Sequence, residues 1–205
     1  MHFHKLFFPQ FYFFKKIKFI LMAINLEKKI YSAVAELKNF NIKKSPFAYV
    51  WDQDIVIKSR NHLLFTRNSR YADYLTKNEK NSMFYTYKVN NLFPNRKNVE
   101  PIFSMEEVIY ARNQDKLGFV FLDSERSIET KKFLNEIKDH IDEKTIFFCP
   151  ILINFEEYEI RALYGIMEFC MEQGKKLEWI CIDGSPRLYE HVDKGFNHAA
   201  CFKIV

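Results

Sequence analysis

The chain has 205 residues, enough for one large domain or two small ones, and its 28% of charged residues excludes wholesale disorder. Its formal net charge is +5, and all but one of these charges come from four lysines that precede Met22 with no acid among them: Lys5, Lys15, Lys16 and Lys18. Because the rest of the chain is nearly neutral and has no stripe of basic and aromatic residues, we expect no nucleic-acid partner.

The stretch before Met22 is rich in phenylalanine and is interrupted by Pro9 and by the lysine cluster at 15–18. A membrane-spanning helix needs about 20 predominantly apolar residues, so lysines near the centre predict that there is no transmembrane span. A secretory signal places its charge before the apolar run, and this stretch has the opposite order. Two interpretations remain: an anchor on a membrane surface, or an extension ahead of a true start at Met22. We favour the second, with 1–21 outside the core and 22–205 as a single domain.

The first half of the chain predicts one helix followed mainly by strands. Apolar residues at steps of three and four predict a helix over 25–41. Runs of β-branched and aromatic residues, then a short periodic segment, predict four strands and a second helix, at 47–51, 54–57, 62–66, 83–89 and 104–113. All five glycines come later, from Gly118 onward, and this shift in composition predicts a soft boundary near 95–117.

The second half alternates strands with helices more clearly. Continuous apolar runs predict strands buried on both faces, at 116–123, 145–153, 176–183 and 199–205. Apolar stripes predict helices between them, at 127–141, from about 155 to Gly174, and at 185–194. Trp179 lies inside one of these strands and should be buried, whereas Trp51, which precedes two aspartates, should be more exposed. The alternation predicts an α/β fold with a mixed sheet that contains parallel pairs.

The four cysteines lie far apart, with no CxxC pair and no histidine at zinc-ligand spacing: Cys149, Cys170, Cys181 and Cys201. Without a secretory signal we expect reduced, mostly buried thiols and no metal site. The same reasoning predicts an intracellular, cytoplasmic protein.

Three short motifs near the C-terminus carry a resemblance to a known family. They are Pro150-Ile151-Leu152 in one strand, Ile182-Asp183 at the end of the next, and Gly195-Phe196 before the last. With the order strand, long helix, strand, short helix, strand, the region 145–205 resembles the C-terminal half of the GNAT N-acetyltransferase superfamily. The resemblance implies an acyl-CoA-dependent N-acyltransferase, with acetyl-CoA or another acyl-CoA as cofactor and a small-molecule or protein amine as substrate.

The resemblance also implies where the cofactor binds. In GNAT folds one strand splays from its neighbour and the pantetheine arm lies in the gap; proline, which cannot donate to a sheet ladder, suits such an opening. The cofactor would therefore lie along this strand and the start of the next helix, at Pro150, Ile151, Leu152, Ile153, Asn154 and Arg161. The loop 154–159 departs from the family's glycine-rich pattern, since it has three glutamates and no glycine. Capping of the helix by Asn154 explains this loop without a ligand.

The proton donor of the family corresponds to a position four residues before Gly195. His191 stands there in this sequence, and Tyr189 is six residues before the glycine. A histidine can donate a proton near neutral pH, so the resemblance implies His191 or Tyr189 as the catalytic residue.

Two alternatives stay open. The first keeps the GNAT-like fold as a non-catalytic interaction or sensing module, which the acidic loop favours. The second is an unrelated doubly wound α/β protein, in which Asp123 and Asp183 end adjacent parallel strands, where such sheets bind ligands. No glycine-rich fingerprint supports that second alternative.

Overall fold

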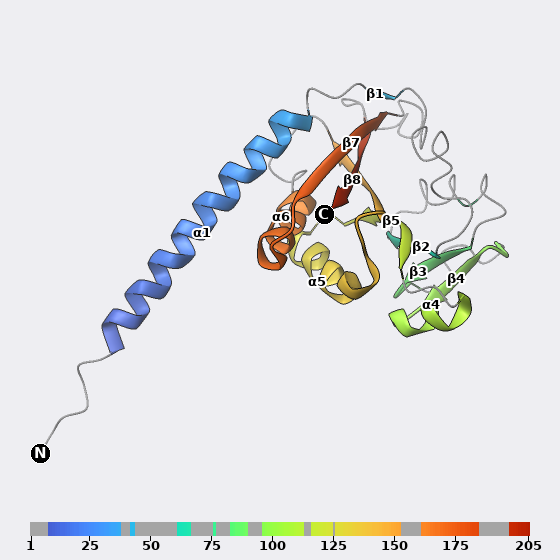
Figure 1. Cartoon of the computed structure of the whole chain (residues 1–205), viewed down its shortest axis with the longest axis horizontal. Helices are drawn as coiled ribbons and strands as arrows, with labels where there is room; N and C mark the ends of the chain where they lie inside the picture. The colour runs from blue at the N-terminus through green and yellow to red at the C-terminus, as the bar shows by residue number, and fades with distance from the viewer. Residues whose placement is uncertain are drawn as a thin grey trace, which may run out of the picture.

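The fold is known from a computed structural model, and its described part forms one eight-stranded sheet with helices packed against it (Figure 1). The described residues are 8–37, 42–43, 61–66, 76, 83–89, 96–112, 116–124, 126–152, 161–184 and 197–205. The strands are β1 (Ile42–Lys43), β2 (Asn61–Thr66), β3 (Phe84–Tyr87), β4 (Val99–Ile102), β5 (Leu117–Asp123), β6 (Ile146–Leu152), β7 (Leu177–Gly184) and β8 (Asn197–Ile204). The helices are α1 (Phe8–Leu37), α4 (Met105–Arg112), α5 (Ser127–Ile137), the short 3-10 turn η1 (Lys138–His140) and α6 (Arg161–Gln173).

The strand order across the sheet is β1-β7-β8-β6-β5-β2-β3-β4. The central pairs β2–β3, β2–β5, β3–β4 and β5–β6 are parallel, and β8 runs antiparallel to both of its neighbours, β6 and β7. This mixed sheet with intervening helices confirms the predicted α/β class. Several predicted elements correspond to observed ones. They are the strands at 62–66 (β2), 83–89 (β3), 116–123 (β5), 145–153 (β6), 176–183 (β7) and 199–205 (β8), and the helix at 104–113 (α4).

Both faces of the central strands are buried. Every residue of β3 and the first six of β5 are buried, as continuous apolar runs predict for parallel strands covered on both sides. On one face Phe121 stacks on Phe148, with ring centroids 5.6 Å apart. On the other Phe147 stacks on Phe202 at 5.2 Å. Trp179 is buried, which confirms the prediction for that residue; Trp51 lies outside the described residues.

Helices α5 and α6 pack against each other over one face of the sheet (Figure 1). Gly165 of α6 lies against the first turn of α5: a Cβ at this position would be 2.3 Å from the carbonyl oxygen of Ser127 and 2.9 Å from Cβ of Thr130. The absence of a side chain therefore allows the two helices to approach closely. The end of α6 is marked by Gly174, whose φ of +66° is the left-handed stop that the sequence predicts.

Helix α1 is longer than the helix predicted over 25–41, since it begins at Phe8 and ends at Leu37. Pro9 falls in its first turn, where proline is tolerated. The missed part has no clear 3.6-residue period, because most of its residues are apolar or aromatic and its lysines are clustered at 15–18, so the sequence shows no apolar stripe there. No helix in the described part of the chain combines the length and the hydropathy needed to cross a bilayer.

The expected GNAT-like arrangement is wrong. It requires the strands at 145–153 and 176–183, which are β6 and β7, to be neighbours that splay apart around acyl-CoA. In the structure β8 lies between them and pairs with both, from Phe147–Phe202 to Leu152–Asn197 on one side and from Leu177–Ile204 to Gly184–His198 on the other. The gap that would hold the pantetheine arm is filled by a strand. The strands that precede β6 in the chain are also parallel, where a GNAT fold has antiparallel ones.

Several predictions fall outside the described residues. They concern the strands at 47–51 and 54–57, the loop 154–159 and the helix at 185–194. The soft boundary near 95–117 as a division between domains, and 22–205 as a single domain, stay predictions.

Candidate functional site

The strand order reverses direction between β2 and β5. From β2 the chain adds β3 and β4 on one side, and then crosses back to place β5 and β6 on the other. Helices and loops that leave two such strands diverge to opposite sides, so a crevice forms outside their carboxyl ends; ligands of open α/β sheets bind at this point. The carboxyl ends of β2, β3 and β5, with the side chains around them, are therefore the candidate site.

The register brings the ends of these strands to one level. Thr66, the last residue of β2, pairs with Asp123, the last residue of β5, and its hydroxyl donates a 2.8 Å hydrogen bond to Oδ2 of Asp123. Thr66 is buried and Asp123 is half-buried. The bond spans the reversal, and it leaves a carboxylate at the rim of the sheet.

Strand β6 separates from β5 near the same place. The parallel ladder between them runs from Phe119–Ile146 to Phe121–Phe148, and β6 then continues beside β8. Cys149, the next residue of β6, is buried, and burial raises the pKa of its thiol well above the usual range, with the nearby Asp123 carboxylate adding to the effect. The Cys149 thiol is thus a neutral packing group next to Asp123 and is no nucleophile.

A second polar group, the Glu136 cluster, consists of Tyr87, Lys88 and Glu136. The Tyr87 hydroxyl donates to Oε2 of Glu136 at 2.5 Å, and Nζ of Lys88 donates to the same oxygen at 2.9 Å. The Lys88 ammonium also lies 4.8 Å from the centroid of the Tyr87 ring. Among the described residues, none donates to the other oxygen, Oε1.

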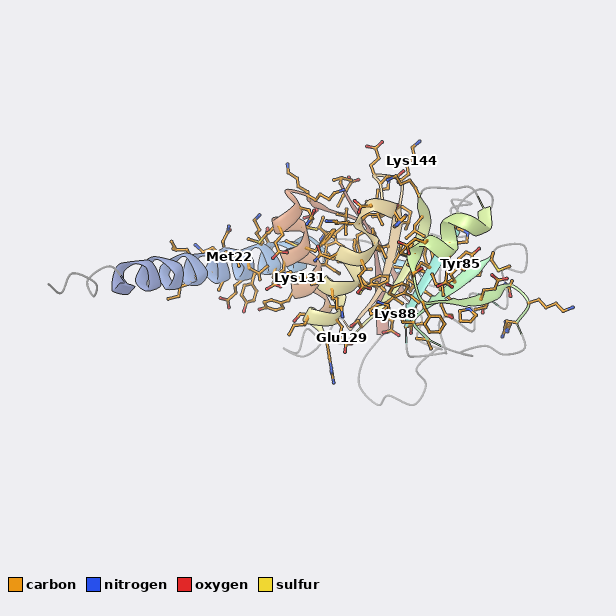
Figure 2. All side chains as sticks on the ribbon, turned by 90° about the horizontal axis from the view of Figure 1, so that it is seen from below. Met22, Tyr85, Lys88, Glu129, Lys131 and Lys144 are labelled. Carbon is orange, nitrogen blue, oxygen red and sulfur yellow. The ribbon has the colours of Figure 1, made fainter. Side chains whose placement is uncertain are left out.

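Local backbone geometry positions the Glu136 cluster. Tyr87 ends β3, and Lys88 follows it with a φ of +54°, in the left-handed region that side chains rarely adopt. The amide of Lys88 still donates to the carbonyl oxygen of Ile102 at 2.8 Å, so β3 stays tied to β4 where the chain turns. Figure 2 shows Lys88 and Glu129, a residue of the first turn of α5, at the same edge of the molecule, opposite Lys144, which precedes β6.

Aromatic packing supports the same cluster from below. Phe65 of β2 stacks on Phe133 of α5, with centroids 4.1 Å apart and planes 7° from parallel. Tyr87 packs edge-on against Phe133 at 5.4 Å. These contacts hold α5 over β2 and β3, and they place Glu136, three residues after Phe133, within reach of Tyr87.

The three groups of the Glu136 cluster stabilise one another's ordinary protonation states. Burial, and then the hydrogen bond to Glu136, raises the pKa of Tyr87, so the phenol stays a donor. The hydrogen bond to Glu136 raises the pKa of Lys88. Burial by itself would raise the pKa of Glu136, but the hydrogen bonds from Tyr87 and Lys88 outweigh it and the net pKa is lowered. A carboxylate is therefore held ionised beside a cation.

The residues predicted to bind acyl-CoA are not gathered in this site as a set. Pro150, Ile151 and Leu152 lie in β6 opposite Ala199, His198 and Asn197 of β8. Arg161 begins α6. Pro150 lies past the end of the ladder to β5 and is paired with β8 on its other side, so the gap expected beside it for the pantetheine arm is occupied by a strand. His191, Tyr189, Ile153 and Asn154 lie outside the described residues.

Sequence reasoning identified one member of the site and missed the others. Asp123 appeared under the doubly wound alternative, as the carboxylate that ends a strand, and the structure places it at the reversal. Asp183, named with it, is wrong as a neighbour, since β7 is separated from β5 by two strands. Nothing in the sequence marks Thr66, Lys88 or Glu136 as a member of a site. Lys88 and Glu136, for example, are 48 residues apart in sequence, and the packing of α5 brings them together.

The described residues contain no group of three His, Cys, Asp or Glu side chains that could hold a metal ion. The chemistry available at the site is that of a carboxylate at the reversal point, a second carboxylate, an ammonium group and a phenol. These groups suit hydrogen bonding to hydroxyl and amino groups of a ligand.

No protein-family model matches the chain, and no curated protein matches it by sequence. Solved structures do resemble it. A precorrin-6y C5,15-methyltransferase from Geobacter metallireducens shares 11% identity over 82% of this chain and 94% of that one, with a TM-score of 0.49. An rRNA methylase from Streptococcus thermophilus shares 10% over 79% and 98%, with a TM-score of 0.48. Fibrillarin from Aeropyrum pernix, with natively bound S-adenosyl-L-methionine, shares 14% over 78% and 74%, with a TM-score of 0.47.

These structures are methyltransferases and a fibrillarin, and no N-acetyltransferase is among those described. The position of β8 between β6 and β7 corrects the GNAT resemblance, and with it the expectations that the resemblance implied: the acyltransferase activity, its GNAT-fold alternative, and the acetyl-CoA or acyl-CoA cofactor.

Proposed function

We propose that the carboxyl edge of β2, β3 and β5 binds a nucleoside-containing cofactor of the S-adenosylmethionine type, and that the protein is a methyltransferase. The reversal of strand order between β2 and β5, with the Thr66–Asp123 hydrogen bond across it, is the observation that supports a ligand site there. The similar fibrillarin from Aeropyrum pernix holds natively bound S-adenosyl-L-methionine, which is therefore the first ligand to test.

The side chains at the edge fit such a ligand in their chemistry. In dinucleotide-binding sheets an acid about 20 residues after the first phosphate loop accepts a hydrogen bond from a ribose hydroxyl. Here the residues at that distance from Thr66 are Tyr87 and Lys88, and the carboxylate beside them comes from Glu136 of α5. Its Oε1 would accept from a ribose hydroxyl, and Asp123 would accept from an amino group of the cofactor or of the methyl acceptor.

One departure concerns glycine. No glycine occurs before Gly118, so the segment that follows β2 has none, whereas close approach of backbone to a ligand favours glycine. Asparagine and serine, the residue types at 68–69, also favour turns. When bound, S-adenosylmethionine supplies an electrophilic methyl group; the protein's own groups orient the cofactor and the acceptor and hold the acceptor's proton.

The test is calorimetric titration of the full chain with S-adenosylmethionine and S-adenosylhomocysteine. We expect binding, and we expect Asp123→Asn to weaken it by about tenfold or more, as loss of a charge-assisted hydrogen bond predicts. Asp139→Asn is the matched control, because Asp139 lies in η1 at the other end of α5 and is exposed. Equal affinities for the native chain and Asp123→Asn, or no binding of either compound, would refute the proposal.

The methyl acceptor is a separate question, which a radiolabelled methyl donor addresses with RNA, protein and small-molecule pools. The near-neutral body of the chain leads us to expect a small-molecule or protein acceptor. Transfer to RNA alone would contradict this expectation and leave the cofactor site intact.

A further inference from the structure

Among the described side chains of helix α1, those buried against the body lie in its C-terminal part. Leu26, Ile30 and Ala33 are buried at spacings of four and three residues, one face of a helix, and α1 contacts α6 and β7. Before Leu26, each residue from Ile20 to Asn25 is exposed. Figure 1 shows α1 running away from the sheet toward the N-terminus, and Figure 2 shows Met22 on the projecting part.

The projecting part, residues 8–25, spans about 27 Å at 1.5 Å per residue. An isolated helix of this length is marginal in water even for favourable sequences. A second surface that contacts the projecting part would therefore stabilise it.

Large apolar side chains are exposed on this part of α1. Relative exposure is 47% for Ile20, 61% for Leu21, 43% for Met22 and 45% for Ile24. Successive residues of a helix point 100° apart, so Ile20, Leu21 and Met22 point in three different directions. One partner helix would cover a single seam and leave the other directions in water, whereas a lipid phase can contact several at once.

The charge of residues 8–25 indicates which kind of surface would bind them. Residues 8–25 contain Lys15, Lys16 and Lys18 and no aspartate or glutamate. Two copies of this helix would bring six lysines together without an acid to offset them, which disfavours a symmetric pair. Anionic lipid headgroups have the complementary charge, and aromatic residues, of which the segment has Phe8, Phe11, Tyr12, Phe13, Phe14 and Phe19, favour the membrane interface.

We propose that residues 8–25 of α1 dock the protein on an anionic lipid surface. The lysines engage the headgroups and the apolar side chains enter the boundary between headgroups and acyl chains. The helix lies on the membrane, and the sheet with its carboxyl edge remains in water.

The experiment measures partition of the full chain onto vesicles by co-sedimentation. Vesicles of phosphatidylcholine alone are compared with vesicles in which phosphatidylserine is about a third of the lipid. We expect strong binding to the anionic vesicles and weak binding to the neutral ones. Each lysine near such a surface contributes about a fivefold gain, so the triple variant Lys15→Gln, Lys16→Gln, Lys18→Gln should lose on the order of a hundredfold.

A matched control removes the same charge from the body. The triple variant Lys97→Gln, Lys144→Gln, Lys176→Gln has the same net charge as the triple variant of α1, and all three of its lysines are exposed. We expect it to bind anionic vesicles as the native chain does. A second variant, Leu21→Gln with Ile24→Gln, tests the apolar contribution and should weaken binding to anionic vesicles about tenfold. Far-UV circular dichroism checks that the body of each variant is folded.

Three outcomes would overturn the proposal. One is no binding of the native chain to anionic vesicles, and another is equal loss for both lysine variants, which would show that only net charge matters. The third is a dimer in light scattering that Leu21→Gln with Ile24→Gln dissociates, which would assign this surface to a second copy of the chain.

Discussion

At the scale of single residues, Glu136 has an importance that its half-exposed position on α5 does not suggest. It accepts hydrogen bonds from Tyr87 at the end of β3, 49 residues away in sequence, and from the following Lys88, 48 residues away. We expect Glu136→Gln to lower the free energy of unfolding by about 1 kcal/mol, since one bond is part-buried and charge-assisted and the lysine pair is partly screened by solvent. Urea denaturation measures the difference.

Glu129→Gln is the control for this substitution, because Glu129 makes the same kind of ion pair on the same helix. Its partner Arg126 is 3.4 Å away with 72% of its side chain exposed, and such pairs contribute little. We expect a smaller loss of stability for Glu129→Gln, about 0.5 kcal/mol, which includes the loss of an acid from the first turn of α5. Equal effects of the two substitutions would mean that the Glu136 cluster is as solvated as an ordinary surface pair.

The same carboxylate predicts a dependence of stability on pH. The folded-state pKa of Glu136 is lowered from the ordinary value of 4.5, so the folded state favours the ionised form. Its contribution is complete above about pH 5 and is lost as the pH falls through the lowered pKa. The stability difference between the native chain and Glu136→Gln should therefore be largest near neutrality and shrink toward pH 3; a difference that grows on acidification would contradict this reasoning.

At the scale of elements, the contact between α5 and α6 depends on Gly165. Replacing glycine by alanine inside a helix is usually favourable by about 1 kcal/mol. Here the new Cβ would lie 2.3 Å from a backbone carbonyl oxygen of Ser127, which cannot rotate away as a side-chain end can. We expect Gly165→Ala to destabilise by about 1–3 kcal/mol, as overpacking does.

Gly174→Ala separates steric contact from backbone conformation. Nothing lies within 4 Å of a Cβ at Gly174, but its φ is +66°, so the expected cost is about 1 kcal/mol from conformation alone. If Gly165→Ala were neutral or stabilising in urea denaturation, α5 and α6 would be free to move apart, and the close approach would have no energetic consequence.

Most of the described helices and strands could be predicted from the sequence, but which strands lie next to each other in the sheet could not. Continuous apolar runs such as 116–123 identify buried strands, and Gly174 marks a helix end, because both signals are local. No local sequence signal indicates that β8 lies between β6 and β7, because the apolar pattern of the last strand would be the same at the edge of the sheet and inside it. The mistaken GNAT resemblance has this cause, since the predicted order of β6, α6, β7 and β8 along the chain was right and their expected order across the sheet was wrong.

At the scale of the molecule, the body and the projecting part of α1 should be separable. Among the described side chains of α1 the first buried one is Leu26. We expect a chain that begins at Met22 to keep its Tm within a few degrees, as measured by circular dichroism. Ile30→Ala provides the contrast, because Ile30 is 1% exposed and truncating such a residue costs about 2–5 kcal/mol. A large loss of Tm on removal of 1–21 would show that the phenylalanine-rich segment packs on the core.

The candidate site is a property of this whole arrangement. Asp123 could be recognised from its place after a buried strand, but Thr66 becomes its partner only when β2 and β5 are neighbours. Glu136 becomes a partner of Tyr87 only when α5 crosses β2 and β3 on Phe133. Neither contact can be predicted from sequence spacing, because both depend on pairing between segments that are about 50 residues apart.

The central place of β8 has a consequence for how the sheet closes. In the described sheet, β7 and β1 reach the other strands only through β8, although β8 follows both of them in the chain. Until β8 pairs with β6, the edge of β6 on that side is open, and an open edge of apolar sequence pairs readily with other chains. The insertion of β8 between β6 and β7 is therefore the folding step that protects this edge against aggregation.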